Sequence, residues 1–238
     1  NVPIHIEEWG ITSGGTTGVS ARPTADVRNS EYGAAFLTSL VARHIEIRQT
    51  NDRLFDGFNF CSSGYETIAE SDFMGYRTLH TKSGFHKPIL NAYKLLNRLG
   101  DSLLTVDASP DNRHITSFAT KDENKISIVV SNYQHDKIYG EGQSYSVDLN
   151  IKHDWEPNAK VLIKHWRIDQ EHSNAYTVFK ELDSPKLPYP MQVDAIKSRM
   201  DLEMMKEPEI ISVKEMKDIR FDLPCNAVSL IEIIISDL

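Results

Sequence analysis

Cysteine is scarce in this sequence, and other features that would point to particular protein classes are missing too. Only two cysteines, Cys61 and Cys225, occur in 238 residues. They are far apart and form no CxxC or Cys/His spacing, so neither a zinc site nor a disulfide scaffold is indicated, and both are expected to be buried free thiols. No apolar run is long enough to span a bilayer; the run at 228–235 has the length of a strand.

The sequence also lacks a long basic run, and its formal net charge is -8. This charge balance disfavours nucleic acid or an anionic membrane surface as a partner, and an uncharged ligand suits it better. Gly14 and Gly15 lack the strand-turn-helix context of a phosphate loop and are interpreted as part of a loop over the site. No metal ion or cofactor is expected. The 40% hydrophobic content is typical of a soluble globular chain with a sizeable core, in one or two domains.

Hydrophobic periodicity divides the chain into two unlike halves. Up to residue 99 the pattern predicts strand, helix, strand, helix, at about residues 2–9, 28–48, 54–61 and 86–99. Both helices have apolar residues close to a 3.6-residue period, which predicts amphipathic helices. Alternation of this kind favours parallel strands joined by right-handed crossovers, as in a barrel or a doubly wound sheet. Two such units cannot close a barrel.

The second half, residues 100–238, is predicted to be rich in β-strands. One helix is expected at about residues 191–205. A series of short strands separated by polar turns is typical of a β-sandwich. The expected strands lie at 103–108, 114–119, 125–131, 145–151, 160–167, 209–213 and 228–235.

The most informative residues lie at the end of the first expected strand, in residues 5–10 (HIEEWG). If Glu7 points to one face of the strand, Glu8 lies on the other face or just beyond the carboxyl end, where barrel enzymes place catalytic groups. Retaining glycosidases need one ionised carboxylate to attack the anomeric carbon and a second carboxyl about 5–5.5 Å away to protonate the leaving oxygen. Glu8 can be the attacking carboxylate. Taken alone, however, a Glu-Glu-Trp triplet is more often a solvated edge beside a packing Trp.

A resemblance along nearly the whole chain favours the catalytic interpretation of Glu8 over a solvated strand edge. Residues 4–10 (IHIEEWG) resemble the end of the seventh barrel strand in glycoside hydrolase family 39, the β-xylosidase and α-L-iduronidase group. Residues 73–93 are similar to the family's eighth loop and last barrel helix. Residues 167–176, together with 184–185, are similar to a signature in its accessory sandwich, and residues 228–232 to its terminal strand. The resemblance implies an α/β plus all-β fold. The last two βα units of a TIM (β/α)8 barrel, residues 1–99, would precede a C-terminal β-sandwich, residues 100–238.

Carried over residue by residue, the resemblance makes Glu8 the nucleophile, because Glu8 stands directly before the aromatic residue. Glu66 keeps the first of two paired glutamates that contact sugar hydroxyls in the family. His5, Trp9 and Tyr65 are expected to contact substrate beside them, although a strand histidine facing a barrel interior is more often simply hydrogen-bonded there. Outside this site, His172, Asn174 and Tyr176 are expected to hold a loop against the barrel, Trp155 and Trp166 to be core, and Met200, Met204 and Met205 to be packing.

The sequence also departs from the family pattern. Asn59 and Ser63 replace a Trp and an Asp of the eighth strand, which bears on xylose specificity more than on reaction type. The family's acid/base follows an Asn, and no Asn-Glu pair occurs in this sequence. The chain also opens directly in a strand-like run. We therefore expect the C-terminal, nucleophile-bearing part of a longer retaining exo-glycosidase, inactive on its own.

Two function classes stay open on this evidence. In the first, the chain is part of a β-xylosidase-like hydrolase whose partners are a carbohydrate and either the missing N-terminal barrel portion or another copy. In the second, it is a non-catalytic carbohydrate-binding or scaffold sandwich. An upstream open reading frame that encodes the earlier barrel units would decide between them. A periplasmic or secreted location would suit a polysaccharide-degrading enzyme.

Overall fold

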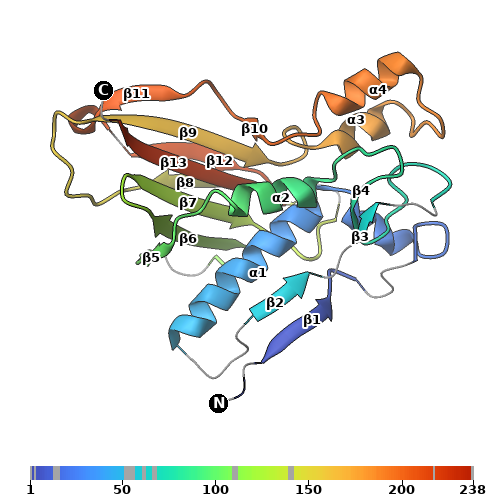
Figure 1. Ribbon diagram of the computed structural model, residues 1–238, viewed down its shortest axis with the longest axis horizontal. Coiled ribbons are helices and arrows are strands. Elements are labelled where there is room, and N and C mark those ends of the chain that lie inside the picture. The colour runs from blue at the N-terminus through green and yellow to red at the C-terminus, as the bar shows by residue number, and fades with distance from the viewer. Residues whose placement is uncertain are drawn as a thin grey trace.

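The computed structural model describes residues 2, 4–12, 17–50, 57–60, 63–65, 69–108, 112–138, 142–216 and 218–236. Figure 1 shows a broad antiparallel sheet, helices α1 and α2 against it, and α3 and α4 at one end. In chain order the elements are β1 (His5–Trp9), the 3-10 helix η1 (Pro23–Arg28), α1 (Glu31–Thr50), β2 (Gly57–Phe60), β3 (Ser63–Tyr65), β4 (Thr78–His80), α2 (Pro88–Leu96), β5 (Ser102–Leu104), β6 (Ile115–Lys121), β7 (Lys125–Asn132), β8 (Tyr145–Leu149), β9 (Lys160–Ile168), α3 (Ala175–Glu181), α4 (Pro190–Lys197), β10 (Glu203–Met204), β11 (Glu209–Ser212), η2 (Val213–Glu215), β12 (Ile219–Leu223) and β13 (Val228–Ser236).

The first half has the alternation of strands and helices that the sequence predicts. β1 and β2 pair in parallel, with His5 opposite Gly57 and Ile6 opposite Phe58. Because parallel neighbours need a crossover, α1 runs back along the pair from the carboxyl end of β1 toward the start of β2. The predicted parallel pairing is confirmed.

Helix α1 is more deeply buried than an amphipathic helix. Eight of its first nine residues are buried, Glu31 to Ser39 with only Phe36 partly exposed, whereas Ile47 near its end is 40% exposed. The small residues Ala34 and Ala35 are fully buried and let neighbouring elements approach closely. The predicted single apolar stripe is therefore wrong for the first half of α1, which is covered on all sides.

The second half is built on a seven-stranded sheet in the order β10-β9-β13-β7-β6-β5, with β11 pairing a further stretch of β9. Every pairing in it is antiparallel. β13 lies centrally between β7 and β9 and is hydrogen-bonded along both edges. A separate two-stranded sheet joins β12 to β8. The predicted series of strands after residue 100 is confirmed.

The two faces of the large sheet support two different cores, because side chains alternate along each strand. On one face, Val129 of β7 and Leu230 of β13 pack with Leu37 of α1 and Leu95 of α2. On the other face, a second cluster packs against strands β8 and β12. Its buried members are Ala119, Ile128, Val130, Val161, Ile163, Val213, Leu223, Ala227, Ile231 and Ile233. The first core thus joins helices that precede residue 100 to strands that follow it.

Several elements differ from the sequence prediction. The helix expected at 191–205 is α4 over Pro190–Lys197, after which the chain turns and pairs with β9 as β10. Consequently Met200 packs in a core beside Phe179, whereas Met205 is 39% exposed and does not share a helix with it. Further short elements among the described residues were not predicted, because they depend on tertiary contacts: η1, β3, β4, α3, η2 and β12.

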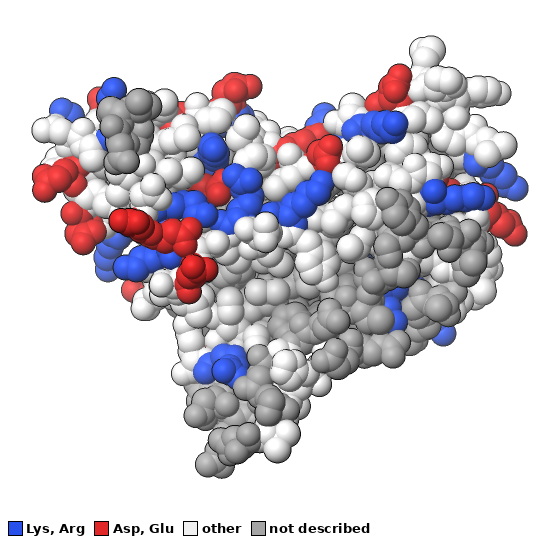
Figure 2. Space-filling model, in the orientation of Figure 1, with Lys and Arg blue, Asp and Glu red and all other residues white. Residues whose placement is uncertain are grey.

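Charged side chains of opposite sign are interspersed on the face shown in Figure 2. One ion pair joins the end of α2 to the sheet: Arg98 donates to Glu232 at 2.8 Å and lies over the Trp166 ring at 4.3 Å. The Trp166 indole donates to the same carboxylate at 2.6 Å, and that side chain is only 3% exposed. Trp166 and Trp155 both pack against core clusters, as predicted. None of the helices within the described ranges is both long and apolar enough to cross a bilayer.

His165 of β9 makes folding sensitive to pH. Its Nε2 lies 2.9 Å from the hydroxyl of Ser229, and its ring packs against Phe221. Burial, and next the charge of Arg167, lower the pKa of His165 from 6.5 to about 3. Below pH 6.5 the unfolded chain takes up a proton here that the folded chain takes up only near pH 3. Stability is therefore complete above pH 6.5 and is lost as the pH falls from there.

We predict that the free energy of unfolding falls by about 1.4 kcal/mol per pH unit in this window because of His165 alone. His165→Gln keeps a polar side chain but does not titrate, so it serves as the matched control for the other ionisable groups. Urea unfolding at pH 7 and pH 5 should show that the parent loses roughly 2 kcal/mol more than the variant. Equal losses would contradict the prediction.

Candidate active site

The carboxyl end of β1 contains an irregularity at the two glutamates singled out by the sequence. Ile6 lies opposite Phe58 and Trp9 opposite Phe60, with a register shift between them. β1 thus advances three positions while β2 advances two (9 − 6 against 60 − 58), which leaves one extra residue at Glu7 and Glu8. Such a bulge re-aims side chains and is frequent beside active sites. Simple alternation therefore does not assign faces to the two glutamates.

The structure describes the backbones of Glu8, Trp9 and Tyr65, whereas their side chains lie outside the described part. Tyr65 ends β3 and pairs with His80 of the parallel strand β4. Other predicted positions lie wholly outside the described residues: Gly14, Gly15, Cys61 and Glu66. Their roles stay predictions. Cys225 is a buried free thiol, as predicted, and burial raises its pKa to about 11.

His5 lies at the opposite end of β1 from Trp9. A Cβ added to Gly57 would be 3.4 Å from Nδ1 of His5, so the imidazole packs over the first residue of β2. His5 is exposed, and Glu8 follows it by three residues, which is about 10 Å along a strand. The role of His5 in substrate binding stays a prediction.

Beyond β1, two arginines lie beside the chain that follows the glutamates. A Cβ added to Gly10 would be 3.2 Å from Cδ of Arg77, so the Arg77 side chain lies against the residue directly after β1. Arg28 is 5% exposed and donates hydrogen bonds to the carbonyl of Thr12 at 2.9 Å and to that of Gly75 at 3.0 Å. Burial and the neighbouring charge of Arg77 lower the pKa of Arg28. Positive charge is therefore concentrated at this end of β1.

Neither arginine was singled out by sequence reasoning. One signal was available for Arg28, because it stands at the start of a predicted helix, and a cation near a helix N-terminus is unfavourable. An arginine at this position is therefore expected to have a role other than stabilising the helix. For Arg77 no comparable signal exists, since its proximity to Gly10 depends on how the chain after β3 folds back.

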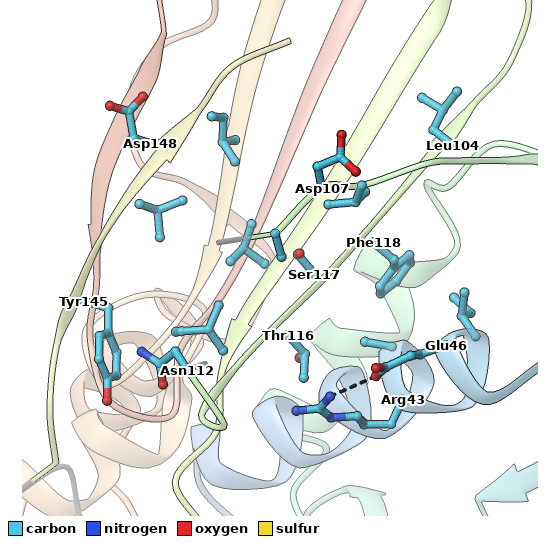
Figure 3. A pocket seen from close by; sticks show the side chains of 18 of the residues that line it. Arg43, Glu46, Leu104, Asp107, Asn112, Thr116, Ser117, Phe118, Tyr145 and Asp148 are labelled. Carbon is cyan, nitrogen blue, oxygen red and sulfur yellow. Dashed lines mark hydrogen bonds and ion pairs between the residues drawn. The ribbon is translucent and has the colours of Figure 1, made fainter. Parts of the chain in front are cut away.

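A pocket of about 500 Å³ lies elsewhere, between the second half of α1 and strand β8. Figure 3 shows the ion pair of Arg43 and Glu46, at 2.8 Å, on its α1 wall, and Tyr145 and Asp148 on its β8 wall. Because α1 runs back toward the start of β2, its second half lies at the amino ends of β1 and β2. The pocket is therefore at the opposite end of these strands from Glu8.

A metal centre is not formed by the described side chains, among which no group of three or more His, Cys, Asp or Glu is arranged to hold an ion.

The predicted loop contacts of Asn174 and Tyr176 are confirmed. Asn174 Nδ2 donates to Glu31 at 2.8 Å, and the Tyr176 hydroxyl donates to Asp26 at 2.7 Å. Both acceptors precede residue 100, so these side chains hold the loop after β9 against the first half of the chain.

Comparison with known proteins places this geometry in a family. The chain matches glycosyl hydrolases family 39 over residues 1–213. A β-xylosidase from Geobacillus stearothermophilus is 23% identical over 203 residues, 83% of this chain and 35% of that protein. A monomeric β-xylosidase from Caulobacter crescentus aligns with a TM-score of 0.72 and 16% identity, over 98% of this chain and 46% of that one. A bacterial orthologue of human α-L-iduronidase aligns with a TM-score of 0.68 and 14% identity, over 88% and 39%.

The chain thus spans less than half the length of each of these relatives. At such low identity, the likeness to the two solved structures shows a shared fold. The family match is stronger evidence, because it covers most of the 238 residues and includes both the β1 end and strands β5 to β11. The resemblance seen in the sequence is confirmed: this chain belongs to glycosyl hydrolases family 39.

Proposed function

We propose that this chain is the nucleophile-bearing part of a retaining, β-xylosidase-like exo-glycosidase. Residues 1–99 would supply the last two βα units of a TIM barrel and residues 100–238 its accessory sandwich. The observation that carries the proposal is the bulge at Glu7 and Glu8, at the carboxyl end of a strand with a parallel neighbour. Barrel enzymes place their catalytic groups at that end of the strands.

In the proposed reaction, the ionised carboxylate of Glu8 attacks the anomeric carbon and the bond to the leaving oxygen breaks. A second carboxyl, about 5–5.5 Å away, protonates that oxygen. It then removes a proton from water, whose oxygen attacks the anomeric carbon and releases Glu8 and the sugar. We place this acid/base outside these 238 residues, since the family's Asn-Glu pair is absent from the sequence.

The charges at the end of β1 support this role for Glu8. Arg77 lies against Gly10, two residues from Glu8, and Arg28 binds the carbonyl of Thr12. Positive charge close to a carboxyl group favours its ionised form. A nucleophile must be ionised when substrate binds, so arginines beside this stretch of chain are consistent with the proposed role of Glu8.

The remaining predicted residues would bind the sugar. We propose that Glu66 accepts hydrogen bonds from sugar hydroxyls, and that Trp9 and Tyr65 offer aromatic surfaces to the apolar face of the ring. His5 would take part only if the substrate extends along β1 away from Glu8. With Asn59 and Ser63 at positions where the family has other residues, the identity of the sugar is the least constrained part of the proposal.

Exposed apolar side chains gather at the start of β1 and directly before it. Val2 and Ile4, which precede the strand, are 87% and 56% exposed, and Ile6 within it is 39% exposed. Contiguous exposed apolar side chains are rare on a stable surface. We propose that the N-terminal barrel portion covers them, or a second copy where that portion is missing.

For the full-length protein, we predict that Glu8→Gln lowers kcat by at least about 10³-fold, because the amide cannot form the glycosyl-enzyme. Glu7→Gln is the matched control, since it makes the same change one residue away within the same bulge. It should keep most of its activity on an aryl β-xyloside. Full turnover by Glu8→Gln, or a larger loss in Glu7→Gln, would overturn the assignment.

We also predict that the isolated chain is inactive and associates with itself. Without the acid the leaving group departs unprotonated, which removes a factor of roughly 10² to 10⁴ in rate. The uncovered apolar side chains should promote association, which size-exclusion light scattering would detect. The assay compares an aryl β-xyloside with a natural xylo-oligosaccharide. Brisk cleavage of the oligosaccharide by a clean monomer would show that the acid lies within this sequence.

A further inference from the structure

Arg28 connects two segments that are far apart in the sequence. From one guanidinium, Nη2 donates to the carbonyl of Thr12 at 2.9 Å, and Nη1 donates to Gly75 at 3.0 Å and Thr17 at 3.3 Å. Thr12 and Thr17 belong to the loop that follows β1, and Gly75 belongs to the segment between β3 and β4. One buried side chain therefore joins the loop after β1 to the segment that leads into β4.

Neighbouring contacts fix the same two segments. Asn29 Nδ2 donates to the carbonyl of Phe73 at 2.7 Å, and the amide of Gly75 donates back to Asn29 Oδ1 at 3.1 Å. The amide of Val19 donates to the carbonyl of Met74 at 2.7 Å. Gly75 has a φ of +74°, and a Cβ there would be 2.8 Å from the carbonyl oxygen of Ala25. The segment can approach η1 this closely because position 75 has no side chain.

The free-energy cost of burying the Arg28 guanidinium indicates that its buried position has a specific role. Burial is the largest cause of its lowered pKa, followed by repulsion from Arg77. A structural link between two loops could also be made by a neutral side chain, which would not lose the hydration of a charge on burial. A guanidinium differs in having several donors fixed in one plane, so that it can bind carbonyls of both segments at once.

We infer that Arg28 is a positioning residue for catalysis, which sets the backbone at the end of β1 and thereby the direction of Glu8. The inference rests on the proposed role of Glu8. Thr12 follows Glu8 by only four residues, so a shift of the Thr12 carbonyl is transmitted directly to the bulge. The bulge has less ladder hydrogen bonding than a regular strand, and its geometry therefore depends on what holds the chain beyond it.

The test uses Arg28→Lys in the full-length protein, with Arg43→Lys as the matched control. Lysine keeps the charge but offers a single ammonium in place of the planar fork. Arg43 is an exposed residue of α1 that pairs with Glu46, at the other end of the helix. We expect Arg28→Lys to lower kcat by roughly 10- to 100-fold with KM within about threefold, because misplacement of a reacting group affects the chemical step. Arg43→Lys should leave both constants unchanged.

Amide hydrogen exchange on the same proteins reports the position of the backbone directly. In Arg28→Lys, exchange should become faster at residues 9–12 and 73–77 and stay unchanged in the large sheet. If Arg28→Lys does not fold, Gly75→Ala disturbs the same contact from the acceptor side and should give the same selective loss of kcat. A folded Arg28→Lys with full kcat, or with only a raised KM, would overturn the inference.

Failure of this inference is distinguishable from failure of the proposed function. Full turnover by Glu8→Gln would overturn the proposed function, whatever Arg28→Lys does. An inactive Glu8→Gln together with a fully active Arg28→Lys would overturn the positioning role alone and leave Arg28 as a structural link.

Discussion

The first turn of α1 meets the loop that follows β9, and the rest of the candidate site depends on this contact. Glu31 is 4% exposed and accepts a hydrogen bond from Asn174, whose own side-chain oxygen caps α3. Burial raises the pKa of Glu31, and the bond from Asn174 opposes that rise. A hydrogen bond to a buried carboxylate contributes about 1.5–3 kcal/mol, and an acidic residue in a first helical turn is further favoured by the helix dipole. Arg28 lies three residues before Glu31. The contact with the loop after β9 and the hydrogen bonds of Arg28 therefore come from one short stretch of chain, residues 28–31.

The antiparallel sheet therefore supports the site physically. Its helix-facing side shares a core with α1 and α2, and the ion pair of Arg98 and Glu232 joins the end of α2 to its central strand. The proposed boundary between residues 99 and 100 separates elements that share this core. In this arrangement the antiparallel sheet holds α1, and η1 directly before α1 holds the loop after β1 and the segment before β4.

The sequence predicted the parts of the fold that repeat a simple period. The parallel pairing of β1 and β2 and the long strands β7, β9 and β13 follow from apolar alternation or runs, and they were found. The elements that were missed depend on contacts far away in the chain. α3, for example, is seven residues long and is capped by Asn174, which is bound to Glu31 of α1. In the site, the location of Glu8 near the end of the first strand was predictable from the residues around it. The bulge was not, because it depends on the register between β1 and β2. The proximity of Arg77 to Gly10 was not predictable either, because no local pattern indicates how the chain after β3 folds back.

The central claim is that Glu8 forms a covalent bond with the sugar. A 2-deoxy-2-fluoro xyloside with a good leaving group would trap that intermediate in the full-length protein, because the fluorine slows release more than formation of the glycosyl-enzyme. Peptide mapping by mass spectrometry should find one sugar per protein on the peptide that contains Glu8, and Glu8→Gln should prevent the labelling. A sugar on Glu7 or Glu66, or on a carboxylate outside these 238 residues, would contradict this account.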